Sequence, residues 1–508
     1  MSVEIEVAQT LEQINEILKE VAKEKIDPSV YTQILQECSN SLKIELEGVA
    51  DTALRKMGIK RCMELLDLHL YRSNAYRVVY KRVDNGEIVK YGGLYKRGVS
   101  LGNVTAGCNR STTAFWSRVA LPREVEFENF WGGHNGFFAQ PKRGQTLEGE
   151  SLDNCLWVWG VNTDGCLGVG NTSNVDIPKR VNLPTRAVKI CVGHSESTGY
   201  QTTLLLGEDG FVYGCGRNAY GELGIGNTIN PNAWTKSPTL SNMKDIALAS
   251  NGSVGYSMGI NRDGELYVWG WGGGYALGNG STNNVLTPVK IITSAKVIGI
   301  FPSIWREGEN YYQTSFILLE DKSLWGAGYN GQKNISQNHT NNVTSFCKVL
   351  LEDNTPLANI KKVSPSSVFG TSFALSESGK LYAWGYGNYG FGDDSGRANN
   401  QRAKVRIENV QDFWAVTDKQ YTRCLVKLEN GSFKAFGLNS DRGCGIGSST
   451  DCYSFADVII PEGELSGIKW QCFNAEGGLT CIVDNEFYAC GTSLDYSINF
   501  TCGTLQKQ

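Results

Sequence analysis

Glycine-rich loops are the first candidates for chemistry in this chain, because such loops often cradle a phosphate. The clearest one, "LYVWGWGGGYALGNG" at residues 266–280, joins an aromatic stretch to a glycine-rich run. A nucleotide-binding loop needs a Lys-Ser or Lys-Thr after its glycines, and neither pair follows here. Similar stretches recur along the chain, whereas a phosphate loop is needed once. The pattern therefore indicates architecture and not a phosphate site.

Histidines are the next candidates for catalysis or metal binding. No Gly-x-Ser-x-Gly, His-Glu-x-x-His or paired metal-ligand spacing is present. Two of the histidines occupy the same position in the repeat described below, which favours a structural role for them. The four histidines are His69, His134, His194 and His339. We expect no catalytic residues, no metal site and no cofactor, and hence a protein that is not an enzyme.

The 15 cysteines form no Cys-x-x-Cys pair, so neither a zinc site nor a redox motif is indicated. We expect free, buried thiols in a chain that folds in a reducing compartment. The alternative is a disulfide among Cys472, Cys481 and Cys490.

The elements that position these loops form a sevenfold repeat with a spacing of about 52 to 58 residues. In each unit, two apolar runs precede the glycine loop, and a pair such as Asp-Gly or Asn-Gly turns the second run into the aromatic stretch. We therefore predict three or four short antiparallel strands per unit, in an all-β propeller. The copies align on Gly160, Gly216, Gly270, Gly328, Gly385, Gly437 and Gly491.

The residue before each aligned glycine is apolar or soft but varies in size. Such a position suits a buried slot between neighbouring blades, where volume must be filled and chemistry is not fixed. We expect the tryptophans among them to belong to the core and not to a ligand platform. These residues are Trp159, Cys215, Trp269, Ala327, Trp384, Phe436 and Cys490.

The unit "V..I..G.H....L...DG.LY.WG.N..G.LG.GN", clearest at Val188–Asn227, resembles the repeat of the regulator of chromosome condensation family. Members of that family form seven-bladed propellers. The resemblance covers about 390 residues, from near Phe115 to the C-terminus, and implies a seven-bladed β-propeller at residues 115–508. It says little about function, because propellers host many unrelated functions.

Residues 1–74 are predicted to form a helical assembly or attachment segment. Val7, Leu11, Ile14, Leu18 and Val21 are spaced four, three, four and three residues apart, as in an a/d seam. One amphipathic helix docked on its own protein and a helix that self-associates or docks on a partner both fit this pattern. We predict that the seam mediates homo-oligomerisation or docking into a larger particle.

Residues 75–114 are predicted to form a β-hairpin collar or a partial repeat. The stretch "YRVVYKRVDNGEIVKYGGLY" has a hairpin pattern with an Asp-Asn-Gly turn and resembles the second half of a repeat. An eighth blade built from these residues is the main alternative to the seven-bladed arrangement.

Charge and hydropathy narrow the classes of partner. The net charge is −4 with a pI of about 5.8, which gives no footprint for nucleic acid. No apolar run approaches 18 residues, and the first residues, "MSVEIEVAQT", lack the pattern of a signal peptide. We therefore expect neither nucleic-acid binding, nor membrane insertion, nor secretion.

Aromatic residues in the glycine loops are the candidate binding residues. They follow the aligned glycines, so they should lie outside the buried slot near one rim of the propeller. Flat aromatic faces suit sugars and other amphipathic ligands; the alternative is that they cover their own blade edges. The candidates are Tyr220, Trp271, Tyr275, Tyr329, Tyr386 and Tyr389.

Two functional hypotheses of different class follow. The first is a structural and recognition protein, similar to virion-attached tail fibre or receptor-binding proteins of bacteriophages. Its N-terminus would dock on other virion proteins, its propeller would meet a host surface glycan or protein, and it would be made in the host cytoplasm. The alternative is a cytoplasmic scaffold or small-GTPase exchange regulator of the same repeat family. A glycan lyase or hydrolase on a propeller is a third, weaker hypothesis.

Overall fold

The computed structural model divides the chain into two compact units, which are described separately. The first holds Met1–Ser100 and Asn109–Val119, and the second holds Leu101–Cys108 and Ala120–Lys507. The predicted helical segment and its seam residues lie outside the described residues. These are 77–82, 88–99, 112–118, 121–122, 125–132, 136–193, 201–307, 310–365, 371–387, 390–392, 400–418, 421–440, 443–460, 462, 465–473, 476–483, 486–491 and 502–507.

The described part of the first unit is a three-stranded antiparallel sheet of β1 (Arg77–Arg82), β2 (Ile88–Val99) and β3 (Thr112–Arg118). Arg82 pairs with Ile88, so β1 and β2 are antiparallel neighbours. The described strands of this region make a sheet of three and not a complete four-stranded blade.

The described part of the second unit holds seven four-stranded antiparallel sheets, and in every one the strands pair with their neighbours in chain order. Sheet 1 comprises β4 (Phe127–Gly132), β5 (Gly136–Pro141), β8 (Cys155–Gly160) and β9 (Val175–Asn182). Sheet 2 comprises β10 (Ala187–Val192), β11 (Thr202–Gly207), β12 (Val212–Gly216) and β13 (Thr235–Lys236). Sheet 3 comprises β14 (Met243–Ser250), β15 (Gly255–Asn261), β16 (Leu266–Gly270) and β17 (Val285–Ile291).

Sheet 4 comprises β18 (Val297–Glu307), β19 (Asn310–Leu319), β20 (Leu324–Gly328) and β21 (Val343–Lys348). Sheet 5 comprises β22 (Ile360–Ser364), β23 (Thr371–Ser376), β24 (Leu381–Tyr386) and β25 (Asn400–Ile407). Sheet 6 comprises β26 (Val410–Asp418), β27 (Tyr421–Leu428), β28 (Phe433–Gly437) and β29 (Cys452–Asp457). Sheet 7 comprises β30 (Leu465–Phe473), β31 (Glu476–Val483), β32 (Glu486–Gly491) and β33 (Cys502–Lys507).

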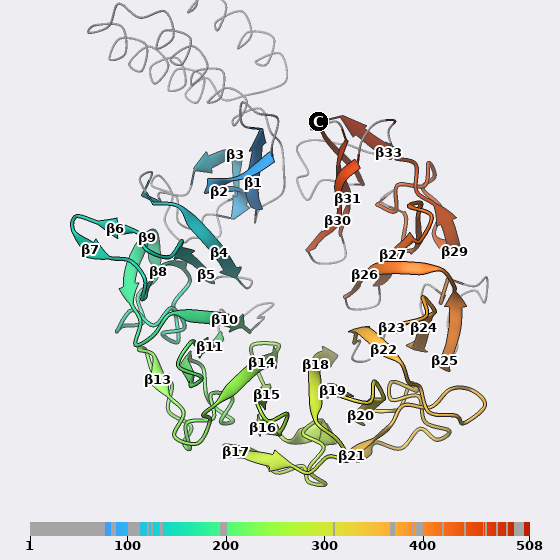
Figure 1. Ribbon diagram of the computed structural model, residues 1–508, viewed down its shortest axis with the longest axis horizontal. Helices are drawn as coiled ribbons and strands as arrows, with labels where there is room; N and C mark the ends of the chain where they lie inside the picture. The colour runs from blue at the N-terminus through green and yellow to red at the C-terminus, as the bar shows by residue number, and fades with distance from the viewer. Residues whose placement is uncertain are drawn as a thin grey trace, which may run out of the picture. The chain divides into compact units, whose positions relative to one another are not determined.

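Figure 1 shows these sheets following one another in chain order, each beside the next. The sequence prediction of seven all-β repeats is confirmed. Each aligned glycine ends its third strand, except that Gly385 is followed by Tyr386 as the last residue of β24. Two smaller elements interrupt the pattern: the hairpin of β6 (Thr146–Leu147) and β7 (Glu150–Ser151) in sheet 1, and the 3₁₀ turn η1 (Gly273–Tyr275) in sheet 3.

The first strand of each of the seven sheets carries a β-bulge at the same place, one residue after its start. A bulge of this kind bends the strand and increases its twist. Its recurrence shows that the repeat extends to details of backbone register. The bulges lie at Phe127/Asn129, Ala187/Lys189, Met243/Asp245, Val297/Gly299, Ile360/Lys362, Val410/Asp412 and Leu465/Gly467.

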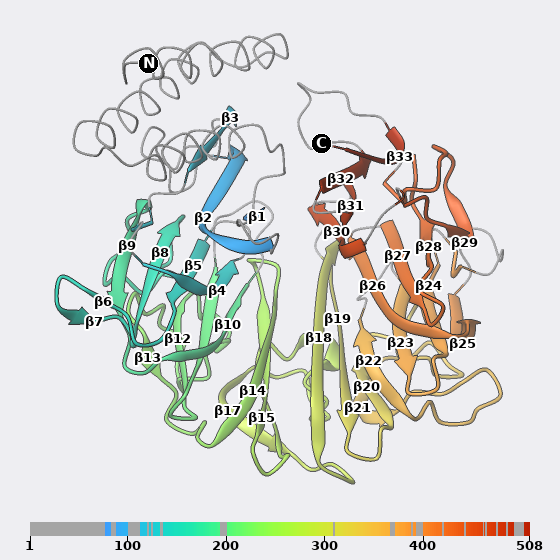
Figure 2. The same cartoon turned by 45° about the horizontal axis from the view of Figure 1, so that its top comes forward.

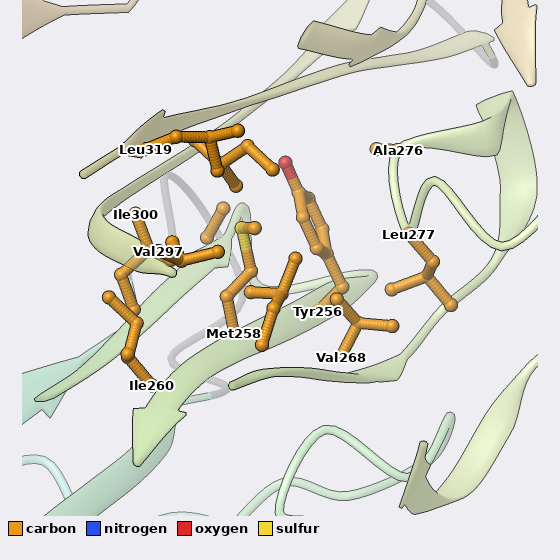
Figure 3. Packing of buried hydrophobic residues seen from close by; sticks show 12 residues of the cluster. Tyr256, Met258, Ile260, Val268, Ala276, Leu277, Val297, Ile300 and Leu319 are labelled. Carbon is orange, nitrogen blue, oxygen red and sulfur yellow. The ribbon is translucent and has the colours of Figure 1, made fainter. Parts of the chain in front are cut away.

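The core lies between consecutive sheets. Tyr256 and Met258 of β15 pack with Ile300 of β18 and Leu319 of β19, and all are buried (Figure 3). The Tyr256 hydroxyl donates a hydrogen bond to the Thr314 carbonyl at 2.8 Å, so this ring satisfies its polar end while its body fills the joint. In Figure 2 the hairpin of β18 and β19, with strands of 11 and 10 residues, lies next to β14 and β15.

The slot before each aligned glycine is buried, as predicted. The six such residues that the structure describes with side chains are at most 2% exposed. The indole N–H of Trp269 donates to the Glu222 carbonyl at 2.7 Å, and that of Trp384 donates to the Asn334 carbonyl at 2.8 Å. Each tryptophan therefore links its sheet to a loop of the preceding sheet, which is a structural role.

Candidate recognition surface

The aligned glycines form the hinge between the third strand and the loop. All six that the described loops contain have positive φ, between 93° and 121°, where side chains are rarely tolerated. A Cβ at Gly216 would lie 2.3 Å from the Gln201 carbonyl oxygen, and a Cβ at Gly437 would lie 1.9 Å from that of Thr422. The strand can end and the loop can begin only because no side chain stands there.

A buried asparagine two residues later holds each regular loop together. Asn218 donates from Nδ2 to the carbonyls of Asn227 and Ile229 at 2.8 and 3.1 Å, and its Oδ1 accepts from the Leu223 amide at 2.9 Å. One side chain thus satisfies three backbone groups that a loop would otherwise leave unpaired. The same position holds Asn162, Asn218, Asn330 and Asn439.

On this loop framework the structure brings three aromatic side chains together, which we call the aromatic rim cluster: Tyr220, Trp271 and Tyr311. The ring centroids of Tyr220 and Trp271 are 6.4 Å apart, and those of Trp271 and Tyr311 are 5.3 Å apart with planes at 70°. The three residues come from sheets 2, 3 and 4, and all are half-buried. Edge-to-face packing of this kind fixes the rings relative to one another.

Tyr311 is a member of the cluster that the sequence reasoning missed. It lies on β19, beside Tyr312, and neighbouring strand residues point to opposite faces of a sheet. Tyr311 accordingly meets Trp271 of sheet 3, whereas Tyr312 packs against Tyr329 with ring centroids 4.7 Å apart. The available signal was the pair of adjacent tyrosines at the start of an apolar run.

The other predicted binding residues are dispersed. Tyr275 ends η1 with a φ of 64°, and in the described part of the chain its ring contacts no other aromatic ring. Tyr386 is the last residue of β24, in sheet 5. Tyr389 lies outside the described residues. The structure therefore unites Tyr220 and Trp271, pairs Tyr329 with Tyr312, and leaves Tyr275 and Tyr386 apart from the aromatic rim cluster.

The loop that carries Tyr220 also contains a buried carboxyl group. Glu222 is 1% exposed, and its Oε2 accepts a hydrogen bond from the Tyr220 amide at 2.8 Å. Burial raises the pKa of Glu222 to about 7, although the charge of Arg217 opposes the rise and that of Asp164 adds to it. This carboxyl group is the ionisable side chain that links pH to the backbone carrying Tyr220.

None of the eight described cysteines forms a disulfide, and five of them are buried. Cys215 donates from Sγ to the Cys166 carbonyl at 3.2 Å, and burial raises the pKa of the Cys166 thiol to about 12. The side chains of Cys472, Cys481 and Cys490 lie outside the described residues, so the alternative of a disulfide among them stays a prediction. Of the histidines, only His339 is described, and it is exposed.

The described residues hold neither a metal-binding cluster nor a membrane-spanning helix. No group of three or more His, Cys, Asp or Glu side chains is arranged to hold a metal ion among them. That same part of the chain contains no helix with the length and apolar character needed to span a bilayer.

The repeats match the model of the regulator of chromosome condensation (RCC1) repeat at residues 153–198 and 263–301. Those two segments contain the glycine hinges at Gly160 and Gly270. The chain thus carries RCC1 repeats, and its seven described four-stranded sheets are consistent with an RCC1-type propeller. It is 26% identical over 314 residues to the mouse E3 ubiquitin-protein ligase HERC2, covering 60% of this chain and 6% of that protein.

A second relative is the ultraviolet-B receptor UVR8 of Arabidopsis thaliana, 26% identical over 306 residues, which are 58% of this chain and 63% of the receptor. The match spans less than two thirds of either relative. The solved structure of human WBSCR16 aligns with a TM-score of 0.50 at 18% identity, covering 74% of this chain and 94% of that one, which supports the fold. The named proteins come from animals and a plant, and the predicted membership among bacteriophage fibres finds no support in them.

Two RCC1 repeats depart from the asparagine-held loop. Gly272 and Gly387 stand where the other described loops have asparagine. At Gly272 a Cβ would lie 2.0 Å from the Asn283 carbonyl oxygen, so the loop backbone occupies the place of the missing side chain. These are the loops of Trp271 and Tyr386. The first of them has replaced an internal polar clamp by close backbone packing and carries the central ring of the aromatic rim cluster.

Proposed function

We propose that this RCC1-repeat propeller is a non-enzymatic recognition protein of the cytoplasm, a scaffold or regulator that binds a protein partner through the aromatic rim cluster. The observation that carries the proposal is the contact of Trp271 with both Tyr220 and Tyr311. Three sheets contribute one ring each, so the surface exists only in the assembled propeller. A partner that binds this surface therefore binds only the folded protein.

The chemistry of the cluster supports a protein partner. Tyrosine and tryptophan are enriched among the residues that dominate binding energy at protein interfaces, because they bury much area and lose little conformational entropy. The rings of the cluster are already held by one another, so less of their freedom remains to be lost on binding. The negative net charge argues against nucleic acid as the partner.

The free cysteines support a reducing compartment. Eight cysteines are described, and none of these forms a disulfide. Thiols stay reduced in the cytosol, whereas oxidising compartments favour disulfides. A virion-attached fibre made in a host cytoplasm would also meet this condition. The choice of a scaffold or regulator therefore rests on the relatives, which are cellular proteins.

A small GTPase is one class of partner that the resemblance to the family implies, and a glycan is the ligand class that the half-buried rings also suit. The following test distinguishes three classes of ligand: another cellular protein, a small GTPase and a glycan. Purified protein is presented to an extract of the cells that make it, to a panel of small GTPases and to a glycan array. The proposal expects saturable binding to one protein, at least tenfold weaker for the double variant Trp271→Ala/Tyr311→Ala. Binding to glycans alone would overturn it.

The control variant for this test removes exposed apolar side chains elsewhere. Ile177 of β9 and Val289 of β17 are 52% and 38% exposed, and both lie on outer strands. The variant Ile177→Ala/Val289→Ala should bind the partner as the wild type does. Equal losses in both variants would indicate a nonspecific apolar contact and contradict the proposed surface.

A further inference from the structure

The RCC1 repeats contain a left-handed position five residues after the aligned glycine. In sheets 1 and 2 it is occupied by Gly165 and Gly221, with φ of 80° and 84°. In sheets 3 and 4 it is occupied by Tyr275 and Lys333, with φ of 64° and 61°. A side chain at such a φ is strained, and strain of this kind is characteristic of functional positions.

The repeat fixes where a side chain at this position is directed. A Cβ built on Gly165 lies 2.5 Å from Asn232 Cα, and one built on Gly221 lies 2.7 Å from Leu286 Cα. Both neighbours belong to the outer edge of the following sheet. A residue at the left-handed position therefore faces the outer strand of the next repeat.

The counterpart of Leu286 in sheet 5 is Arg402. Val285 pairs with the aligned glycine Gly270, and Gln401 pairs with the aligned glycine Gly385, so Leu286 and Arg402 are the next residues in equivalent strands. Lys333 of sheet 4 thus faces Arg402 of sheet 5. Where the joints after sheets 1 and 2 set a glycine against Asn232 or Leu286, this joint sets two cations against each other.

Arg402 is held in place by oxygen acceptors from two segments of sheet 4. Its Nε donates to the Ser336 carbonyl at 3.4 Å, and its Nη1 donates to the Glu352 carbonyl at 3.2 Å and to Asn354 Oδ1 at 2.9 Å. Ser336 belongs to the same turn as Lys333, since its amide donates to the Lys333 carbonyl at 2.8 Å. The remaining nitrogen of the guanidinium, Nη2, is buried and has no hydrogen-bond partner.

No carboxylate neutralises the pair among the described residues. Neither Lys333 nor Arg402 has an acidic side chain within 4.0 Å in that part of the chain, although Asp353 is near enough to feel the charge of Arg402. The Asp353 carboxylate is engaged by the hydroxyl and amide of Thr355 at 2.6 and 2.9 Å. Burial, followed by the charge of Arg402, lowers the pKa of Lys333.

We propose that Lys333 and Arg402 form a binding site for a phosphate-class oxyanion. A doubly charged oxyanion has the acceptor oxygens that the ammonium group and Nη2 lack, and it compensates two facing positive charges with one ligand. The guanidinium is already held through Nε and Nη1, so Nη2 is the nitrogen left to donate to an anion. Free phosphate and a phosphomonoester share this chemistry.

The test titrates the full chain with inorganic phosphate by calorimetry, at constant ionic strength set with sodium chloride. A second arm uses O-phosphoserine, and a third uses acetate. The proposal expects saturable binding of phosphate or O-phosphoserine and at least tenfold weaker binding of acetate. Binding of inorganic phosphate alone identifies the free ion, whereas tighter binding of O-phosphoserine identifies the phosphomonoester. Absence of saturable binding in the first two arms, or equal binding of acetate, overturns the proposal.

Two variants attribute the binding to this site. Lys333→Gln should weaken phosphate binding at least tenfold, whereas Lys244→Gln, which changes an exposed lysine of β14, should not. Lys333→Gly restores the residue found in sheets 1 and 2, so it should raise the melting temperature in phosphate-free buffer and abolish the stabilisation by phosphate. Unchanged phosphate binding in both Lys333 variants would place the anion elsewhere and contradict the assignment.

Discussion

Trp271 packs edge-on against Tyr311, with ring centroids 5.3 Å apart, although the two residues belong to different sheets and lie 40 positions apart in the chain. The contact joins a glycine loop of sheet 3 to the inner hairpin of sheet 4. It shows how the RCC1 repeat creates a surface that no single repeat contains. The stability of the joint and the recognition surface therefore depend on the same loop geometry.

The hinge glycines are predicted to be indispensable for folding. At Gly270, where φ is 101°, a Cβ would lie 2.7 Å from Tyr256 Cα and 2.8 Å from the Gly255 carbonyl oxygen. Gly270→Ala should reduce the free energy of unfolding by more than the roughly 1–3 kcal/mol of backbone strain alone. Denaturant unfolding of the purified variant measures the loss.

A second glycine supplies the control for this substitution. Gly149 also has a positive φ of 84°, but nothing lies within 4 Å of its ideal Cβ. Gly149→Ala should therefore show the strain without the collision and destabilise the protein less than Gly270→Ala. Equal losses would mean that the close approach at the hinge contributes nothing.

The asparagine that clamps a regular loop makes a separate prediction. Asn218→Ala would leave one backbone amide and two carbonyls without their partner. Each net hydrogen bond contributes about 1 kcal/mol, so a loss of about 2–4 kcal/mol in the free energy of unfolding is expected. The exposed Asn227, whose Oδ1 accepts from the Ile229 amide, is the comparison, and Asn227→Ala should cost less than about 1 kcal/mol. Similar values for the two variants would argue against the clamp.

Glu222 predicts how stability depends on pH. Its pKa of about 7 in the folded protein exceeds the ordinary value of 4.5, so the folded state holds the proton more tightly than the unfolded state. The associated stabilisation is present below pH 4.5 and is lost as the pH rises to about 7. The loss is on the order of 3 kcal/mol.

The variant Glu222→Gln isolates that contribution. The amide cannot ionise, so the difference in unfolding free energy between wild type and variant should shift in favour of the variant as the pH rises from 5 to 8. Urea unfolding at four pH values in this range gives the curve. Parallel curves for the two proteins would show that this carboxyl group does not titrate there.

Introducing charged residues into the predicted assembly seam tests whether it mediates self-association. Residues 1–74 lie outside the described residues, and their role rests on the heptad spacing. The double variant Leu11→Asp/Leu18→Asp should dissociate any oligomer, because burying two or three such side chains per helix contributes several kcal/mol at about 1.5–3 each. Light scattering measures the mass, and circular dichroism checks that the propeller stays folded. An unchanged mass would remove the seam from the account.

The repeat architecture could be predicted from the sequence because each unit needs the same residue types at the same positions to form its hinge and its buried slot. Gly216 and Gly270 must be glycine for the hinge, and Trp269 must fill the slot and place its indole N–H on a carbonyl. Because these requirements apply within each repeat, the same residue types recur along the chain at a nearly constant spacing. The pattern therefore predicts seven units of three or four short antiparallel strands and the buried slot.

The aromatic rim cluster could be predicted only in part. Tyr220 and Trp271 were visible because they follow aligned glycines. Tyr311 lies in the inner hairpin, and its contact with Trp271 depends on how far β18 and β19 extend beyond their neighbours. The proximity of Lys333 and Arg402 could not be predicted either. It depends on how adjacent sheets are aligned, and the sequence of a single repeat does not determine that alignment.

The most direct test of the proposed function is the affinity for the partner, measured with and without the rings of the cluster. The partner recovered from the native extract is purified and titrated calorimetrically against wild type, Trp271→Ala/Tyr311→Ala and the control Ile177→Ala/Val289→Ala. All three proteins are first shown to melt within a few degrees of one another. The account predicts that only the ring variant binds at least tenfold more weakly. Wild-type affinity in that variant would contradict the claim that this surface recognises the partner.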